Sequence, residues 1–130
     1  MSELKILIVD DEPHIVILLE EVFELLVEEY EVELLTAMDG EQALALAAEH
    51  RPQLVILDVM LPKISGLAVC QGIKENPDLA GTTVILLTAK GQQFDRQVGL
   101  AMGADCYVTK PFRPRDLLAQ AKEILGIGED

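Results

Sequence analysis

The chain has 130 residues and a mass of 14.3 kDa, the size of one ordinary domain that can bury a core without disulfides or a structural metal. Apolar runs such as residues 15–19 are far shorter than the roughly 20 residues needed to cross a bilayer, so we expect a soluble protein and no membrane partner. The N-terminus shows no secretory signal, and we expect the cytoplasm as its compartment.

The net charge of −13 is unevenly distributed along the chain. Residues 1–50 hold fourteen Asp or Glu against one Lys, whereas residues 51–130 hold nine acidic and nine basic residues. An acidic half of this kind repels the phosphate backbone of nucleic acids. We therefore predict no direct nucleic-acid binding by this chain.

The first predicted strand, residues 4–9, is a short β-branched apolar run that ends at Asp10 and Asp11. A helix is predicted over residues 13–29, with Pro13 in its opening turn and Asp11 as a candidate N-cap. Its apolar stripe at i, i+3 and i+4 spacing is predicted to face the core, and it consists of Ile15, Leu18, Leu19, Val22 and Leu26. Apolar residues off this stripe leave open a deeper burial or a docking surface; they are Val16, Ile17, Phe23 and Leu25.

Strand-like and helix-like patterns continue to alternate through the rest of the chain. The further strands are predicted at residues 33–37, 54–57, 84–87 and 106–109, and the further helices at 41–49, 66–74, 92–102 and 114–125. Five such units predict an α/β fold, a doubly wound parallel sheet with helices on both faces. In such sheets ligands bind at the carboxyl ends of the strands, so function is expected there.

Five polar residues stand at the predicted strand ends: Asp10, Asp11, Asp58, Thr88 and Lys110. Three carboxylates in one crevice would repel one another unless a cation neutralised them, and Mg²⁺ is a hard cation that takes oxygen ligands. One Asp would then be free to attack phosphorus, while Lys110 and the Thr88 hydroxyl hold the phosphoryl oxygens. Taken singly, Asp11 is more often a helix cap than a metal ligand, and Asp58 is more often a solvated turn residue. The prediction of a site therefore depends on the convergence of these residues.

The sequence resembles the response-regulator receiver family of two-component signalling over essentially its whole length. The segments that carry the resemblance are Ile8-Val9-Asp10-Asp11-Glu12-Pro13, Leu57-Asp58-Val59-Met60-Leu61-Pro62, Leu87-Thr88-Ala89-Lys90, Gly103-Ala104-Asp105 and Lys110-Pro111-Phe112. The resemblance implies a flavodoxin-like strand order 2-1-3-4-5, a receiver domain over residues 1–125, and a C-terminal tail or the start of a linker over residues 126–130.

The same resemblance implies the role of each site residue. Asp58 would be the phosphoacceptor, and Lys110, aimed by a cis Lys110-Pro111 bond, would pair with the phosphoryl group. Magnesium would be bound by Asp11 and Asp58 directly, by Asp10 largely through water, and by the backbone carbonyl of Met60. Thr88 and Tyr107 would form the switch: the Thr88 hydroxyl moves toward the phosphoryl group and Tyr107 turns inward.

The implied function is a phosphorylation-dependent switch rather than an enzyme. A histidine kinase or histidine phosphotransfer protein would donate the phosphoryl group, and the response would appear on the surface formed by residues 92–102, 106–109 and 114–125, where an unidentified effector binds. Met60, two residues after Asp58, offers no polar group to orient water, so slow self-dephosphorylation is expected.

Receivers that control transcription dimerise through that same surface, and two intersubunit ion pairs can be compared with this chain. Arg96 and Asp116 occupy the positions of one pair, but Cys106 and Gln120 replace the charged residues of another. A homodimer is therefore expected to be weak or dependent on phosphorylation.

The sequence disfavours three other functions. An aspartyl phosphatase needs a second Asp where Met60 stands. A flavin-binding module needs a Ser-, Thr- or Gly-rich loop where Asp10, Asp11 and Glu12 would repel a phosphate. A receiver-shaped interaction domain that no longer takes a phosphoryl group would not need the complete set of site residues. This chain retains the complete set.

Overall fold

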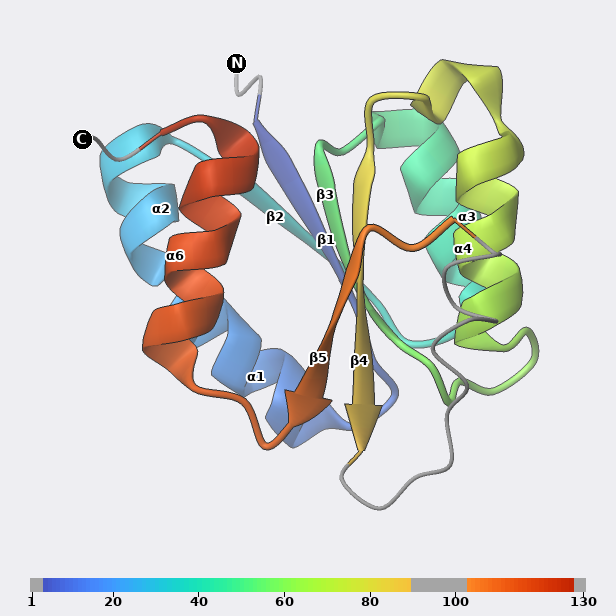
Figure 1. Ribbon diagram of the computed structural model, residues 1–130, viewed down its shortest axis with the longest axis horizontal. Coiled ribbons are helices and arrows are strands. Elements are labelled where there is room, and N and C mark those ends of the chain that lie inside the picture. Colours follow the sequence, from blue (N-terminus) through green and yellow to red (C-terminus); the bar gives the residue numbers. More distant parts are fainter. Residues whose placement is uncertain (1–3, 90–102, 128–130) are drawn as a thin grey trace.

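The computed structural model of the protein describes residues 4–89 and 103–127 (Figure 1). Strands β1 to β5 span Lys5–Val9, Glu33–Ala37, Leu54–Asp58, Thr83–Ala89 and Cys106–Lys110. Helices α1, α2, α3, α4 and α6 span Pro13–Val22, Glu24–Tyr30, Gly40–His50, Gly66–Glu75 and Pro114–Leu125, and a 3-10 turn, η1, spans Pro77–Leu79. The helix predicted over residues 92–102 lies outside the described residues.

The five strands form one parallel sheet in the order β2-β1-β3-β4-β5, which confirms the predicted fold class. All carboxyl ends therefore meet at one edge of the sheet. The register places Asp58 opposite Leu87 on β4, and Lys110 opposite Ala89 on the same strand. Residues far apart in the sequence are thus brought to one edge.

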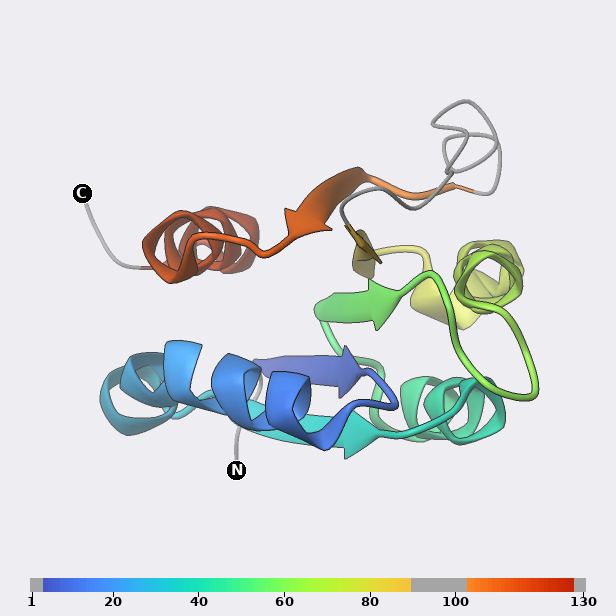
Figure 2. The ribbon, with the colours of Figure 1, turned by 90° about the horizontal axis from the view of Figure 1, so that it is seen from below.

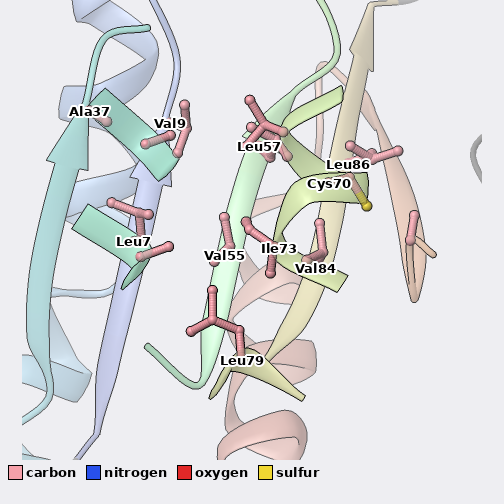
Figure 3. Packing of buried hydrophobic residues seen from close by; sticks show 14 of the residues in the cluster. Leu7, Val9, Ala37, Val55, Leu57, Cys70, Ile73, Leu79, Val84 and Leu86 are labelled. Atoms are coloured by element: carbon pink, nitrogen blue, oxygen red, sulfur yellow. The ribbon is translucent and has the colours of Figure 1, made fainter. Parts of the chain in front are cut away.

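Helices α1, α2 and α6 cover one face of the sheet and α3 and α4 the other (Figures 1 and 2). Successive residues of a strand point to opposite faces, so each strand contributes to both hydrophobic clusters. Leu7 and Leu57, for example, join the cluster under α3 and α4, and Ile8 joins the cluster under α1, α2 and α6. Figure 3 shows the first of these clusters, in which Cys70 and Ile73 of α4 lie against strand residues.

The predicted helix over residues 13–29 is divided in two at Phe23. Phe23 has φ −97° and ψ 7°, and its side chain is completely buried. Its N–H still donates to the Leu19 carbonyl at 3.1 Å, and its own carbonyl accepts from Leu26 N–H at 3.0 Å. The two helices therefore follow one another with a local break. No helix within residues 4–89 and 103–127 is both long and apolar enough to cross a bilayer.

The core-facing stripe of these helices differs from the predicted one. Leu19 and Leu26 of the predicted stripe are buried, and Ile15 and Val22 are partly buried against the same cluster. Val16 and Phe23, off the predicted stripe, are buried as well, so deeper burial is the outcome for these two residues. Residues 15–19 are all apolar, and such a run is compatible with more than one helical face. Packing against the sheet selects the face with Val16 and leaves Ile17 55% exposed.

Gly66, the first residue of α4, lies against the backbone at the end of β3. Its N–H donates to the Val59 carbonyl at 2.8 Å. A Cβ on Gly66 would meet the carbonyl oxygen of Asp58 and lie 2.7 Å from the Cα of Val59. Because these neighbours are backbone atoms of a buried strand, they cannot move without disturbing the sheet edge.

We therefore predict that Gly66→Ala lowers the free energy of unfolding by about 2 kcal/mol or more, because of this overlap. Urea denaturation followed by circular dichroism measures the change. Gly81→Ala is the matched control, since a Cβ on Gly81 has no neighbour within 4 Å. Equal losses in the two variants would contradict the close approach at Gly66.

Candidate functional site

The candidate site lies at the carboxyl edge of the sheet, where β1, β3 and β5 end. Asp10 follows β1 and continues its pairing, because its N–H donates to the Ala37 carbonyl at 3.2 Å. Asp58 and Lys110 are the last residues of β3 and β5. The structure therefore brings together the Asp10 and Asp11 pair, Asp58 and Lys110, which the sequence placed at the ends of three separate strands.

Three carboxylates form the centre of this site. Asp10, Asp11 and Asp58 each offer a carboxylate oxygen, and these oxygens lie within 4.8 Å of one another. Asp10 is completely buried, Asp58 is 5% exposed, and Asp11 faces solvent. The site thus has two buried acids and one at its mouth.

Asp11 does not cap α1, which corrects one of its two predicted roles. The N-cap position belongs to Glu12, whose side chain makes no capping hydrogen bond. Asp10 Oδ1 instead accepts from the Glu12 N–H at 2.9 Å. The Asp11 side chain is therefore available to the acidic cluster.

Backbone amides orient the two buried carboxylates. Just as Glu12 N–H binds Asp10 Oδ1, Met60 N–H donates to Asp58 Oδ1 at 3.2 Å. The other oxygen of each carboxylate, Oδ2, faces Lys110. The Nζ atom of Lys110 lies 3.3 Å from Asp10 Oδ2 and 3.6 Å from Asp58 Oδ2. The Lys110-Pro111 bond is cis, as the sequence resemblance implied.

Glu12 is a further member of the site that the sequence reasoning did not single out. Its Oε1 lies 3.2 Å from Lys110 Nζ, the shortest of the three carboxylate contacts of that ammonium group. The available signal was its position directly after Asp10 and Asp11. Contacts with Lys110, 98 residues away, could not be read from that position alone.

The electrostatics of the site follow from its burial and its excess of acids. Burial, with the neighbouring Asp10 charge, raises the pKa of Asp58 to about 6, although Lys110 opposes the change. Burial also raises the pKa of Asp10. Burial alone would lower the pKa of Lys110, but Asp10 and Asp58 outweigh it and the pKa is raised. One ammonium group therefore does not neutralise the carboxylates around it.

The donor set fits a hard divalent cation. Mg²⁺ binds oxygen ligands at about 2.1 Å, so opposite ligands of one ion are about 4.2 Å apart. Adjacent ligands of the same octahedral ion are about 3.0 Å apart. The three carboxylate oxygens lie within 4.8 Å of one another, which is close to this range of spacings. A dication would also relieve the repulsion from Asp10, which adds to the effect of burial in raising the pKa of Asp58. The residues present therefore suit magnesium.

The side chains of Thr88 and Tyr107 point to one face of the sheet, and the side chain of Leu87 points to the opposite face. Thr88 is buried, and alternation along β4 places it on the side of Val84 and Leu86. Tyr107 is paired with Leu86 and packs against the cluster under α3 and α4. The two predicted switch residues therefore share one face, two positions apart in register.

A family model and similar curated proteins agree with one another. A model of the response regulator receiver domain matches residues 6–122. The alkaline phosphatase synthesis transcriptional regulatory protein PhoP of Bacillus subtilis is 46% identical over 121 residues, which are 93% of this chain and 48% of that protein. The probable transcriptional regulator ycf27 of Galdieria sulphuraria is 49% identical over 121 residues, 93% of this chain and 45% of that protein. The chain thus spans about half the length of these relatives.

Solved structures resemble the fold closely. The BeF3-activated DrrB receiver domain has a TM-score of 0.79 and 38% identity, covering 97% of this chain and 100% of that one. The receiver domain of the sensor histidine kinase PA1611 from Pseudomonas aeruginosa has a TM-score of 0.83 and 26% identity, with the same coverage. That structure holds a magnesium ion in its active-site cleft.

The raised pKa of Asp58 predicts how stability depends on pH without magnesium. Folding disfavours the ionised form of this group, so the stability it contributes is fully present below about pH 4 and is lost as the pH rises through about 6. Asp58→Asn removes the ionisable group. We expect the variant to gain about 1–3 kcal/mol over the unsubstituted chain between pH 4 and 7, measured by urea denaturation with a chelator present.

Added magnesium is the control for this comparison. It should reduce or reverse the advantage of Asp58→Asn near neutral pH, because a bound dication stabilises the ionised carboxylate. Stability curves that stay parallel across the pH range would contradict a raised pKa at Asp58.

Proposed function

The chain belongs to the response regulator receiver domain family, and on that premise we propose that Asp58 is its phosphoacceptor. The donor is a phosphohistidine on a histidine kinase or histidine phosphotransfer protein. The observation that carries this proposal is the buried Asp58 carboxylate, whose Oδ2 faces Lys110 Nζ at 3.6 Å beside two other carboxylates. The chain thereby acts as a signalling switch rather than as an enzyme.

In the proposed transfer, Asp58 Oδ2 attacks the phosphorus atom of the donor. A P–O bond forms, the P–N bond to the donor imidazole breaks, and the imidazole nitrogen keeps the electron pair. Asp58 Oδ1 stays bound to the Met60 N–H, which holds the carboxylate in orientation. Lys110 turns its ammonium group from the carboxylates to the phosphoryl oxygens.

The residues that would hold magnesium are Asp10, Asp11 and Asp58, with the backbone carbonyl of Met60. When bound, the ion supplies positive charge for the phosphoryl oxygens and for the crowded carboxylates. The charge balance supports this assignment, since Asp10, Glu12 and Asp58 all lie within 3.6 Å of the single Lys110 ammonium. A dianionic phosphoryl group would otherwise enter a site that is already negative.

The readout is proposed to begin at Thr88 and Tyr107. Movement of the Thr88 hydroxyl toward a phosphoryl group on Asp58 would free space on the face that Tyr107 shares, and Tyr107 would turn into it. The responding surface comprises residues 92–102, 106–109 and 114–125, of which residues 92–102 lie outside the described residues. An effector binds there, and residues 126–130 form a tail or the start of a linker.

Homodimerisation through that surface is proposed to be weak or to need phosphorylation. Arg96, one member of the first ion pair, lies outside the described residues. Gln120 Nε2 donates to Cys106 Sγ at 3.0 Å within the chain. Cys106 and Gln120 thus form an uncharged hydrogen bond within one chain, which supports the absence of the second intersubunit ion pair.

We predict that acetyl phosphate and magnesium add one phosphoryl group to the chain, detected by intact mass and released by hydroxylamine as expected for an acyl phosphate. Asp58→Asn or a chelator should abolish the addition, because each removes a required oxygen or cation. Asp78→Asn, an exposed acid away from the site, should leave it unchanged. Equal labelling of Asp58→Asn would refute the assignment.

The phosphoryl group should last minutes or longer, since exposed Met60 offers no group to orient water.

The Lys110→Met variant should slow phosphorylation without weakening the binding of magnesium. The rate of phosphorylation should fall by at least about tenfold, because the ammonium group no longer offsets the phosphoryl charge. Magnesium should bind as tightly or more tightly, since a competing positive charge near Asp10 and Asp58 is gone. Mass analysis over time and calorimetric magnesium titration measure the two effects, with Lys122→Met on α6 as the control. Loss of magnesium binding in Lys110→Met would argue against this division of roles.

A further inference from the structure

The loop between β3 and α4, residues 59–65, links the phosphoacceptor to contacts outside the pocket. Within this loop, the Met60 N–H donates to Asp58 Oδ1 at 3.2 Å, and the Met60 carbonyl is one of the proposed magnesium ligands. Lys63 and Ile64 of the same loop contact the start of α3, which the loop passes before α4 begins (Figure 2). The position of Met60 therefore depends on how the loop is held against α3.

Lys63 has an unfavourable backbone conformation in this loop. Its φ is 71°, and the Ile64 N–H donates to the Pro62 carbonyl at 2.8 Å, so the three residues form a γ-turn. A γ-turn with a positive φ at its central residue is rare and strained. Two other non-glycine residues among those that the structure describes have positive φ, but both of them, Glu31 and Arg51, are helix C-caps, where a left-handed residue is common. Lys63 does not end a helix.

The Lys63 side chain reaches an acidic group at the start of α3. Its Nζ lies 3.6 Å from Asp39 Oδ2 and 3.6 Å from Glu41 Oε1. Asp39 is the N-cap of α3, and its Oδ1 accepts a hydrogen bond from the Gln42 N–H at 2.8 Å. The cap fixes one oxygen of this carboxylate and leaves the other toward Lys63. The ammonium group therefore meets a carboxylate that is already oriented.

Apolar contacts hold the same loop close to α3. A Cβ on Gly40, the first residue of α3, would lie 2.6 Å from the carbonyl oxygen of Ile64 and 2.7 Å from its Cβ, so the two segments approach closely. Leu61 and Ile64 are partly buried against the cluster under α3 and α4. Hydrophobic contact is not directional, so it keeps the loop near α3 without specifying the turn. The ion pairs supply direction at Lys63, where the backbone is strained.

The ion pairs and the strain are both small effects. The Lys63 side chain is 58% exposed, and an exposed ion pair contributes little to stability. The strain of a single residue is small beside the stabilisation of a whole domain. Loss of the ion pairs can therefore let the turn relax while the domain stays folded. The geometry of this loop is set locally.

We propose that Lys63 is a positioning residue of the site. Its ion pairs with Asp39 and Glu41 hold the γ-turn, and the turn holds Met60 where its N–H orients Asp58 and its carbonyl binds magnesium. The inference rests on the proposed function, because it concerns the same magnesium and phosphoryl site. The first turn of α3 thereby becomes part of the support of the phosphoacceptor, although it contributes no ligand.

The sign of the effect of Lys63→Met on magnesium affinity tests this role. The substitution removes a positive charge from an acidic chain, so electrostatics alone would tighten magnesium binding. Loss of positioning should instead weaken it by about threefold or more, because the Met60 carbonyl is no longer held. Calorimetric titration of the full chain with magnesium chloride measures the affinity. Lys122→Met on α6 is the control for charge alone, and Lys63→Arg should keep the affinity within about twofold of the unsubstituted chain.

Removal of the acidic partners provides an independent comparison. Asp39→Asn/Glu41→Gln keeps the helix cap, because Asn is as good an N-cap as Asp, but it removes both carboxylates that face Lys63. Magnesium binding should weaken in this variant as well. Adding Lys63→Met to it should cause no further loss, since the same contact is already broken. Losses that add together would contradict a shared contact.

Exchange of the Met60 amide proton with water reads the position of the loop without magnesium or a phosphoryl donor. In the ¹⁵N-labelled chain with a chelator, Lys63→Met should exchange this proton at least about threefold faster, whereas the amide of Leu57 within β3 should keep its rate. A magnesium affinity that stays equal or rises in Lys63→Met, or an unchanged Met60 exchange rate, would overturn the inference.

These measurements are separate from the test of the proposed function. Failure of the unsubstituted chain to accept a phosphoryl group would count against Asp58 as phosphoacceptor, but it would not affect either measurement on Lys63. If the unsubstituted chain bound no magnesium, the exchange rate of the Met60 amide would decide the positioning role alone.

Discussion

The ammonium group of Lys110 lies among Asp10, Glu12 and Asp58, and the rest of the site depends on this arrangement. Its Nζ is within 3.6 Å of all three carboxylates, and its side chain is only 13% exposed. Two ionised aspartates buried close together repel each other, and this cation offsets part of that repulsion. Yet one positive charge leaves an excess of negative charge, and burial together with the neighbouring Asp10 charge raises the pKa of Asp58. The pocket therefore keeps an excess of carboxylates, a donor set that suits a dication.

Backbone contacts at the end of β3 make this geometry possible. Gly66 lets α4 begin against Asp58 and Val59, where any side chain would overlap with the strand. The Met60 N–H then orients Asp58 Oδ1 and leaves Oδ2 toward Lys110. Fold stability and site geometry are coupled here, because the same few backbone atoms support both.

Local patterns were sufficient to predict the five strands, the α/β class and the residues at strand ends. Short β-branched runs such as residues 54–57 indicate buried strands whatever their neighbours, and Asp58 or Lys110 then follows from chain position. Resemblance to a family, rather than periodicity, supplied the strand order. The buried face of α1 was predicted only in part, because residues 15–19 are all apolar and only packing on the sheet buries Val16 more deeply than Ile15.

The sequence by itself therefore determined which chemical groups stand at the carboxyl edge of the sheet, since strand and helix periodicity is a local property. Tertiary structure alone decided which of them touch. Lys110 and Asp10 are 100 residues apart, and their contact requires β1, β3, β4 and β5 to lie in the observed order and register. The role of Glu12, the availability of Asp11 and the break at Phe23 likewise depend on packing between distant segments, which no local pattern encodes.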